Sequence, residues 1–328
     1  MTTQSEWKIP TQAQPRPSDY SYDLDRALSA VLSLSARVPD DAFTAETLGT
    51  ERAGNGVLIR EDGLVLTIGY LVTEAETVWL TTREGRSVAG HVLGFDAATG
   101  FGLVQALGDL GVPALAIGRS DTLKVGDRAV VAGAGGRQRC VAVELVARQE
   151  FAGYWEYVLD EALFTSPAHP HWGGTALIGP RGELLGIGSL QLQQGGSAGG
   201  GSSARPINMV VPIDLLPPIL DDLATRGRAN RPPRPWLGLY ATESEDGIVV
   251  MGIADGGPAD SGGLQAGDVI EAVAGEPVSD LAALFRSVWA LGEAGVRVPL
   301  TVRRDGRAVK LALVSGDRQR FLRAPSLH

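Results

Sequence analysis

The 328-residue chain has few of the side chains that build metal and redox centres. Its one cysteine, Cys140, excludes an internal disulfide and a zinc site built from several thiolates. Its four histidines, His91, His169, His171 and His328, are too few for a histidine-rich metal centre. We therefore expect no metal ion and no other cofactor. Cys140 is assigned no catalytic role, because the sequence positions no partner for it.

Long apolar runs and an excess of positive charge are also absent. No segment approaches the roughly 20 apolar residues that cross a bilayer, and 38 acidic against 29 basic residues give a net charge of −9. This balance argues against nucleic acid and anionic membranes as partners. The first apolar run, 27–36, follows three aspartates where an export signal carries positive charge, so we expect a cytoplasmic protein.

The chain is rich in glycine, with 43 residues, many of them between short β-rich runs. Residues 1–20 are polar and rich in proline and glutamine, and we expect them to be a disordered tail. Apolar residues within 22–37 recur at helical spacing, which predicts an amphipathic helix. From residue 54 to 189, strand-like runs alternate with glycine turns, which predicts an all-β barrel or sandwich.

A second, smaller unit follows, and the chain length is typical of two domains. Residues 194–203 are almost all glycine and serine, which predicts a flexible loop. Residues 226–235 are rich in arginine, asparagine and proline, which predicts an interdomain linker. Residues 236–322 then contain strand-like runs, tight turns and a helix at 280–291. The two expected domains are therefore 21–225 and 236–322.

The second domain carries the most specific local pattern. Residues 257–270 read Gly-Pro-Ala-Asp-Ser-Gly-Gly-Leu-Gln-Ala-Gly-Asp-Val-Ile, which resembles the GPAxxAGLxxGDxI motif of bacterial PDZ domains. Such domains bind an extended peptide as an added strand and hold its terminal carboxylate with backbone N–H groups of a tight loop. The resemblance implies protein or peptide ligands, and it assigns the carboxylate-binding loop to four residues, Trp236, Leu237, Gly238 and Leu239.

Two aromatic residues of the predicted helix have an open assignment. Phe285 and Trp289 lie four residues apart, on a face beside the core positions of the helix. If that face borders the peptide groove, the two rings line a large apolar pocket. Alternatively, they complete the small core or pack against the barrel.

The first domain has motifs of its own. Gly-Asn-Gly-Val-Leu-Ile at 54–59 and Asp-Gly-Leu-Val-Leu-Thr at 62–67 resemble the opening of the HtrA family of trypsin-like serine proteases. Blocks within 95–104, 123–127 and 176–187 resemble later stretches of that family, which also places a barrel domain before a PDZ domain. The resemblance implies a mainly β fold, with a trypsin-like double β-barrel followed by a small α+β PDZ domain.

Such proteases depend on a serine nucleophile, a histidine base and an aspartate that orients the histidine. At the positions of the family's histidine, aspartate and serine motifs, this chain has Tyr70, Gly100 and Gly173. A phenol with a pKa near ~10 is a poor general base at neutral pH, and glycine has no side chain to offer. The resemblance therefore implies that all three triad positions have lost their function.

A shifted alignment would change this interpretation in part. It would place Thr175 or Ser166 near the nucleophile position. A relay rebuilt from His169 or His171 with Thr175 also stays open, because a triad is defined by geometry rather than by sequence order. No shift brings a histidine near residue 70, since the nearest is His91, in a strand-like run. Two histidines at i and i+2 without a third ligand are a weak metal signal.

We expect a non-catalytic, HtrA-like pseudoprotease that binds peptides or protein C-termini through its PDZ domain, as an adaptor or scaffold. One alternative is a serine endopeptidase of the HtrA type with an unconventional active site. Another is a structural subunit of a larger complex. The resemblance also implies a homo-oligomer, a trimer formed through N-terminal residues, for which Trp7, Tyr20 and Tyr22 are candidates.

Overall fold

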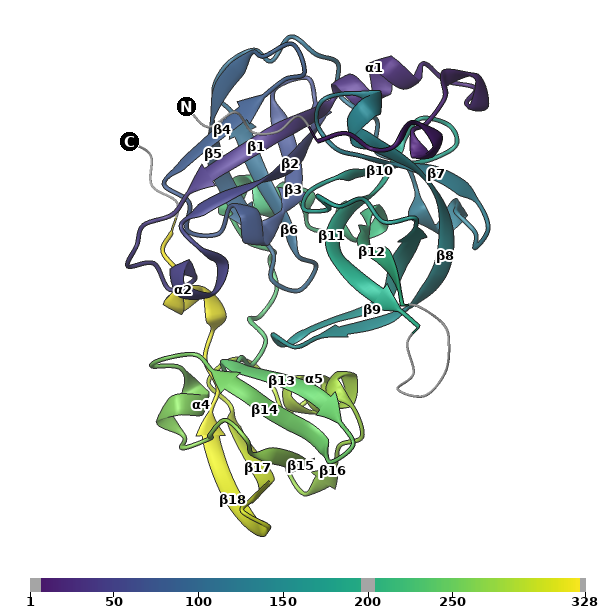
Figure 1. Ribbon diagram of the computed structural model, residues 1–328. Coiled ribbons are helices and arrows are strands. Elements are labelled where there is room, and N and C mark those ends of the chain that lie inside the picture. The colour runs from purple at the N-terminus through teal and green to yellow at the C-terminus, as the bar shows by residue number, and fades with distance from the viewer. Residues whose placement is uncertain (1–6, 196–203, 325–328) are drawn as a thin grey trace. The chain divides into compact units, whose positions relative to one another are not determined.

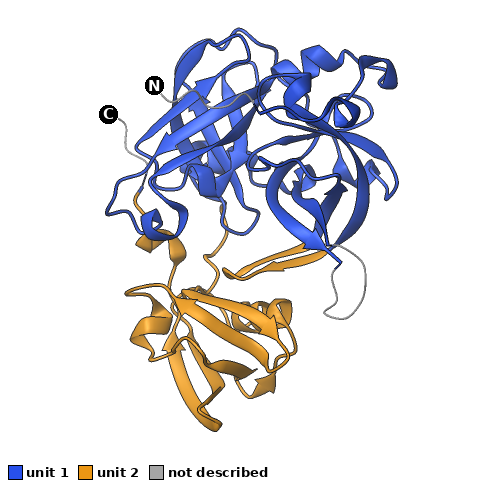
Figure 2. Cartoon of the chain, in the orientation of Figure 1, with its two compact units in different colours: residues 1–149, 161–229, 324–328 blue, residues 150–160, 230–323 orange. Residues whose placement is uncertain are grey.

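A computed structural model describes residues 7–195 and 204–324, which cluster into two compact units (Figures 1 and 2). Of the described residues, unit 1 contains 7–149, 161–195, 204–229 and 324, and unit 2 contains 150–160 and 230–323. This division differs from the predicted domain 21–225, because residues 150–160 group with the second unit. Most of the loop predicted at 194–203 lies outside the described residues, as do residues 1–6 of the predicted tail.

The first half of unit 1 is a closed β-barrel with the strand order β1-β2-β3-β6-β5-β4. Strand β1 pairs antiparallel with both β2 and β4, and this double pairing closes the barrel. Its strands are β1 (Val31–Arg37), β2 (Glu51–Arg60), β3 (Leu64–Ile68), β4 (Thr77–Thr81), β5 (Ser87–Phe95) and β6 (Phe101–Ala106).

The second half of unit 1 is another closed barrel, with the strand order β10-β11-β12-β9-β8-β7. Its interior is filled by buried aliphatic side chains such as Val131, Leu145, Leu163 and Val210. Its strands are β7 (Arg128–Ala132), β8 (Cys140–Gly153), β9 (Tyr157–Ser166), β10 (Ala176–Ile178), β11 (Leu184–Gln194) and β12 (Arg205–Pro212). The prediction of an all-β first domain is confirmed.

The helix predicted over residues 22–37 is wrong in its second half. Helix α1 spans only Leu24–Ser29, and the Asp23 side chain caps it by accepting a hydrogen bond from the Arg26 N–H at 3.0 Å. Residues Val31–Arg37 form strand β1, in which buried and exposed residues alternate. From Leu32 onward the chain alternates apolar residues with serine or arginine, and this period of two is the signature of a half-buried strand.

The disordered tail predicted for residues 1–20 is also corrected, for residues 7–20. Ile9 is buried and its N–H donates to the Gln138 carbonyl at 2.9 Å, while Trp7 and Ala13 pack against the core of the second barrel. Short 3-10 turns follow at Thr11–Ala13 and Pro17–Asp19. A few apolar anchors in a polar segment are enough to fix it, because burying them offsets the entropy of ordering their neighbours.

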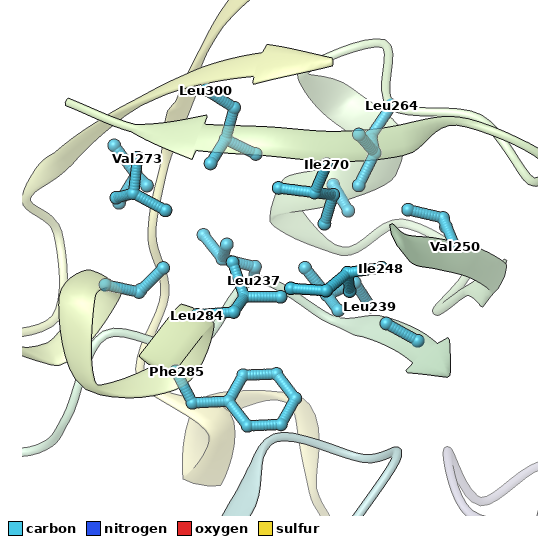
Figure 3. Packing of buried hydrophobic residues seen from close by; sticks show 14 of the residues in the cluster. Leu237, Leu239, Ile248, Val250, Leu264, Ile270, Val273, Leu284, Phe285 and Leu300 are labelled. Atoms are coloured by element: carbon cyan, nitrogen blue, oxygen red, sulfur yellow. The ribbon is translucent and has the colours of Figure 1, made fainter. Parts of the chain in front are cut away.

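Unit 2 is a twisted sheet with the order β13-β14-β15-β17-β18, and β16 pairs with β15. Helix α5 (Leu281–Trp289) begins after Asp280, whose side chain accepts from the Ala283 N–H at 2.7 Å. The helix packs its apolar face on the sheet, as the core side chains in Figure 3 show. The strands are β13 (Leu239–Ser244), β14 (Gly247–Ile253), β15 (Val269–Val273), β16 (Glu276–Pro277), β17 (Arg297–Arg304) and β18 (Arg307–Val314).

The remaining helices are short. They are α2 (Ala45–Leu48), α3 (Leu220–Arg226) and α4 (Pro258–Ser261). Helix α3 ends at Gly227, which adopts a φ of +72° that glycine accepts without strain. In the described parts of the chain, no helix has the length and apolar character needed to cross a bilayer.

Candidate functional site

The three residues that the sequence assigns to the triad positions, Tyr70, Gly100 and Gly173, are called the triad site below. Tyr70 lies in a 3-10 turn, η3 (Gly69–Leu71), directly after β3. The Gly69 N–H donates to the Gly100 carbonyl at 2.7 Å, which joins this turn to the loop before β6. The guanidinium of Arg52 donates to the Tyr70 carbonyl at 2.8 Å, which is a second hydrogen bond that holds the turn. The turn and the loop before β6 are therefore joined directly.

Tyr70 also reaches the nucleophile position. Its hydroxyl donates to the Ser189 carbonyl at 2.9 Å, and a Cβ atom built on Gly173 would lie 2.8 Å from the hydroxyl oxygen. The phenol therefore fills the space in which a residue-173 side chain would begin. Burial raises the pKa of Tyr70 further above its ordinary value of 10.0. The group is a protonated hydroxyl at neutral pH and cannot accept a proton as a base would.

Gly100 ends a tight turn that is held by backbone and side-chain hydrogen bonds. The Gly100 N–H donates to the Asp96 carbonyl at 2.8 Å, and the Asp96 carboxylate accepts from the Thr99 N–H at 2.9 Å. Gly100 has a φ of +85°, a conformation that favours glycine. The carboxylate that this motif retains, Asp96, caps its own turn, and position 100 supplies no side chain to orient a base.

The two histidines near the nucleophile position are engaged in structural contacts. His169 is fully buried; its Nε2 lies 2.8 Å from the Arg139 carbonyl, and its Nδ1 accepts from the His171 N–H at 3.1 Å. The carbonyl partner requires the proton on Nε2. Burial lowers the pKa of His169 from 6.5 to about 4, so the ring is neutral. The exposed His171 ring packs against the Trp7 ring at 4.2 Å.

The Thr175 hydroxyl and the His171 N–H of this region are also engaged in hydrogen bonds. The buried Thr175 hydroxyl donates to the Trp172 carbonyl at 2.8 Å. Within residues 7–195 and 204–324, no hydrogen bond joins the ring of either histidine to a hydroxyl group. In a trypsin-type site the N–H groups of the nucleophile and of the residue two positions earlier hold the oxyanion. Here the earlier N–H, from His171, is directed to His169.

In unit 2, the predicted carboxylate-binding loop forms the entry to β13, and we call residues 236–239 the carboxylate loop. Trp236 packs on Phe321 with the ring centroids 4.8 Å apart, and the side chains of Leu237 and Leu239 are buried in the core. Gly238 has a φ of +76°, which turns its N–H toward the same side as those of its neighbours.

These backbone donors converge on a side chain that the sequence did not indicate. The Glu156 Oε1 accepts from the N–H groups of Leu237 at 3.1 Å, Gly238 at 2.7 Å and Leu239 at 3.2 Å, and its Oε2 accepts from Leu237 at 3.0 Å. Burial raises the pKa of Glu156 from 4.5 to about 7, although the N–H groups and Arg318 act in the opposite direction. Glu156 resembles any other polar residue of a hairpin turn in the sequence, so no local pattern marks it.

The two aromatic residues of α5 belong to the interior of unit 2. Phe285 is only 1% exposed and lies among core side chains such as Leu237 and Leu284 (Figure 3). Trp289 is partly buried, stacks on Phe285 with centroids 6.1 Å apart, and carries the Arg234 guanidinium over its other side at 4.4 Å from the centroid. Both rings are therefore part of the core of unit 2, which also includes Val158 of residues 150–160, and the assignment of the pair to a peptide pocket stays a prediction.

The side chains that bind metals or react as nucleophiles elsewhere are dispersed. In the described residues, no three histidine, cysteine, aspartate or glutamate side chains gather as a metal site would require. Cys140 is fully buried, its thiol lies 3.2 Å from the Gly136 carbonyl, and burial raises its pKa to about 12. Such a thiol is not ionised at neutral pH.

Comparison with known proteins places both units. Residues 54–187 match the trypsin-like peptidase domain family, and residues 235–314 match the PDZ domain family. "Putative serine protease HhoA" of Synechocystis sp. PCC 6803 is 30% identical over 292 residues, which cover 81% of this chain and 68% of HhoA. A "Probable periplasmic serine endoprotease DegP-like" of Pseudomonas fluorescens is 28% identical over 277 residues, 80% of this chain and 56% of that protein. The chain thus spans about two thirds of HhoA and little more than half of the DegP-like protein.

Solved structures agree with the fold. The structure "HtrA-type protease AlgW with tripeptide" has a TM-score of 0.53 at 23% identity and covers 95% of this chain and 99% of its own. A serine endoprotease from Yersinia pestis has a TM-score of 0.52 at 22% identity and covers 89% of this chain and 95% of its own. At these identities the likeness establishes the fold, a trypsin-like double barrel followed by a PDZ domain, as the sequence predicts.

Proposed function

We propose that this chain, which belongs to the HtrA family of trypsin-like peptidases with a C-terminal PDZ domain, is a binding protein that does not hydrolyse peptide bonds. It binds peptides or protein C-termini through the PDZ domain. The observation that carries this proposal is the Tyr70 hydroxyl oxygen, which lies only 2.8 Å from the point where a side chain of residue 173 would begin.

The chemistry of acyl transfer explains why this arrangement matters. Hydrolysis needs an oxygen nucleophile, a base that removes its proton and a group that orients the base. Gly173 provides no nucleophile, Gly100 provides no orienting carboxylate, and the raised pKa of Tyr70 removes it as a base. Loss of a single triad member already lowers the rate by about four to six powers of ten. Loss of all three triad members leaves only the rate contributions of substrate binding and of oxyanion stabilisation.

The binding half of the proposal is supported by the second unit. The N–H groups of Leu237, Gly238 and Leu239 converge on one carboxylate, which is the geometry that captures a peptide terminus. Solved HtrA-type relatives include AlgW with a tripeptide and AlgW with a decapeptide. A ligand with a free terminal carboxylate is therefore the class that we propose for this chain.

A second candidate function is an HtrA-type endopeptidase with an unconventional active site. The names of the relatives favour it, because HhoA and the DegP-like proteins are described as serine proteases. Thr175 would then be the nucleophile and His171 the base. The bond from the Thr175 hydroxyl to the Trp172 carbonyl and the packing of His171 on Trp7 argue against this pair.

The binding protein is proposed to act in the cytoplasm, either as a free adaptor or as a fixed subunit, including a homotrimer. Native mass spectrometry and pull-down from the source cell distinguish these forms. One partner in fixed stoichiometry would favour a subunit, and many weakly held partners would favour an adaptor.

The enzymatic question is tested with casein as an unfolded substrate. The full chain is incubated with casein beside trypsin, and cleavage is followed by electrophoresis. We expect intact casein after incubation with this chain. Cleavage that persists through purification and disappears in Thr175→Ala or His171→Ala would contradict the proposal and establish the endopeptidase.

A further inference from the structure

Unit 2 contains a hairpin tip, residues 150–160, that occupies the place of a bound peptide. It contributes Glu156, which accepts from the carboxylate loop, and one backbone hydrogen bond joins it to the edge of the sheet. The Tyr154 carbonyl accepts from the Ala241 N–H at 3.0 Å, and the next donor along that edge, Leu239 N–H, goes to Glu156. Leu239 and Ala241 are alternate residues of β13, the terminal strand of the sheet. This is the pattern by which an added strand is held.

The same segment is anchored by apolar burial. Val158 is 7% exposed and belongs to the core cluster that includes Leu239 and Phe285, and Ala152 packs against that cluster. Tyr157 is 3% exposed and stacks on Trp155 with centroids 5.5 Å apart. A bound peptide gains affinity from backbone pairing and specificity from such side-chain contacts. The hairpin tip makes both kinds.

Both ends of the tip form ion pairs with α5. Arg286 forms ion pairs with Glu150 and Asp160, each with a nitrogen–oxygen distance of 2.5 Å. Because these pairs are largely exposed, each contributes little by itself. They do fix the orientation of the tip, since one guanidinium binds the residues that precede and follow the turn.

The backbone of Glu156 shows that its placement is imposed by its partners. Glu156 has a φ of +61°, in the left-handed region that non-glycine residues rarely adopt. A residue persists there only when surrounding contacts over-determine it. The N–H groups of the carboxylate loop and the neighbouring charge of Arg318 are the contacts that hold Glu156.

We propose that residues 150–160 are a built-in ligand of the PDZ domain, in which Glu156 takes the place of a peptide's terminal carboxylate. An external peptide then binds by displacing this segment. This inference rests on the proposed peptide-binding function and adds its regulation. It also specifies the competing ligand as a chain with a free terminal carboxylate and an aromatic residue two positions earlier, because Tyr154 stands two residues before Glu156.

A built-in ligand reduces the apparent affinity of the PDZ domain for an external peptide. When the binding-competent form is a small fraction of the protein, the apparent dissociation constant rises by the inverse of that fraction. The probe is a fluorescein-labelled decapeptide that copies residues 147–155 and ends in valine with a free carboxylate. Its C-terminal carboxamide is the matched control peptide. Binding to the full chain is measured by fluorescence anisotropy.

We expect Glu156→Ala to bind the free-carboxylate peptide at least about tenfold more tightly than the unmodified chain. Glu156→Gln keeps the shape and the Oε1 acceptor without titrating, so its affinity for the peptide at pH 7 is expected to stay within about threefold of that of the unmodified chain. Glu245→Ala, at an exposed position of the same unit, is the control and is expected to leave affinity unchanged. Equal affinity of the unmodified chain and Glu156→Ala would overturn the inference.

Hydrogen–deuterium exchange separates this inference from the function on which it rests. The amides of Leu237, Gly238 and Leu239 are expected to exchange slowly in the unmodified chain and in Glu245→Ala, and at least about tenfold faster in Glu156→Ala. Equal exchange in all three proteins would overturn the built-in ligand. Protection that depends on Glu156, together with no binding of the peptide to any variant, would refute the peptide-binding function and support the built-in ligand.

Discussion

The triad site and the carboxylate loop have changed in opposite ways. At the triad site residues 70 and 173 lie close together, and the sequence assigns to its three positions a tyrosine and two glycines. At the carboxylate loop the backbone N–H groups of Leu237, Gly238 and Leu239 all donate to Glu156 of the same chain. In our proposal the first site has lost its chemistry, whereas the second keeps its backbone donors and has an occupant.

The difference arises because one site depends on side chains and the other on backbone groups. Catalysis depends on three side chains, and single substitutions remove it while the barrel core stays intact. Carboxylate binding by a PDZ domain depends on backbone N–H groups, which side-chain substitutions leave in place. A family member can therefore lose proteolysis and keep peptide recognition. The four predictions that follow test one side of this contrast each.

The largest effect is expected at Gly174, beside the triad site. Gly174 has a φ of +75°, and a Cβ there would lie 1.9 Å from the Asn55 carbonyl oxygen. Gly174→Ala therefore combines backbone strain with a steric clash, and it should lower the free energy of unfolding by about 4 kcal/mol. Urea unfolding of the full chain measures it.

Gly126→Ala is the matched control, because Gly126 has a φ of +93° and nothing within 4 Å of the added carbon. It should cost only the backbone strain, about 1–2 kcal/mol. Equal losses for the two variants would show that the barrels tolerate movement between Asn55 and Gly174, and would weaken the argument that the triad site has a fixed backbone.

The next effect is the pH dependence that His169 gives to unit 1. Its folded-state pKa is lowered from 6.5 to about 4, so the unfolded chain binds more protons between these values. The free energy of unfolding should therefore fall by about 3 kcal/mol as the pH drops from 6.5 to 4. The readout is urea unfolding across this pH range.

His169→Gln should remove most of this slope, whereas His171→Gln, at an exposed position, should retain it. A slope that survives His169→Gln would mean that another group titrates, and that His169 is not held neutral by burial. In that case a rebuilt catalytic histidine would again deserve consideration.

A smaller effect is expected from the contact between Tyr70 and residue 173. Because an added Cβ would lie 2.8 Å from the Tyr70 hydroxyl oxygen, Gly173→Ala should cost about 2 kcal/mol. The cost should be smaller in a Tyr70→Phe background, which removes that oxygen. A double-mutant cycle by urea unfolding gives the coupling, and additivity of the two changes would contradict the proposed contact.

The smallest effect concerns the binding of the hairpin tip to the carboxylate loop, which we call seating. Seating weakens as the pH rises, whereas the stability that His169 gives weakens as the pH falls. The seated Glu156 has a pKa raised from 4.5 to about 7, so linkage makes seating strongest below pH 4.5 and weaker as pH rises through 7. Arg318 of η7 (Arg318–Phe321) is the charged group that faces Glu156, and the carboxylate loop presents backbone N–H groups.

Peptide affinity should therefore rise about tenfold between pH 5 and pH 8 in the unmodified chain, by release of the tip. The change should be absent in Glu156→Gln, whose side chain does not titrate. Anisotropy with the labelled decapeptide measures both proteins. A pH dependence that is identical in the two proteins would assign the titration to the peptide or to another group.

Much of the fold could be predicted from the sequence, because it depends on local patterns, whereas the assignment of the triad positions stays a prediction from family motifs. Glycine turns between short alternating runs indicate β-barrels, and the family motifs locate Tyr70, Gly100 and Gly173 by position alone. Residues 31–37 show the limit of periodicity. Their own alternation has a period of two and indicates a strand. The apolar residues just before them have helical spacing, and some residues of the strand also fit that spacing, so the predicted helix continues too far.

The occupant of the carboxylate loop could not be predicted. Glu156 and Gly238 are 82 positions apart in the sequence, and their contact depends on how a hairpin tip and a sheet edge are placed in space. The same holds for Trp7 and Ile9, whose anchoring depends on a barrel surface formed by distant residues. Phe285 could be assigned to a helix, but its burial among residues distant in the sequence required the packed structure.

The most direct test of the central claim, that the triad site has no chemistry, is intact-mass spectrometry after treatment with a fluorophosphonate. The reagent modifies activated serine or threonine nucleophiles, and trypsin treated in parallel shows that it is active. We predict that the full chain keeps its unmodified mass. A stoichiometric adduct that maps to Thr175 would contradict the account and would show that the site has been rebuilt.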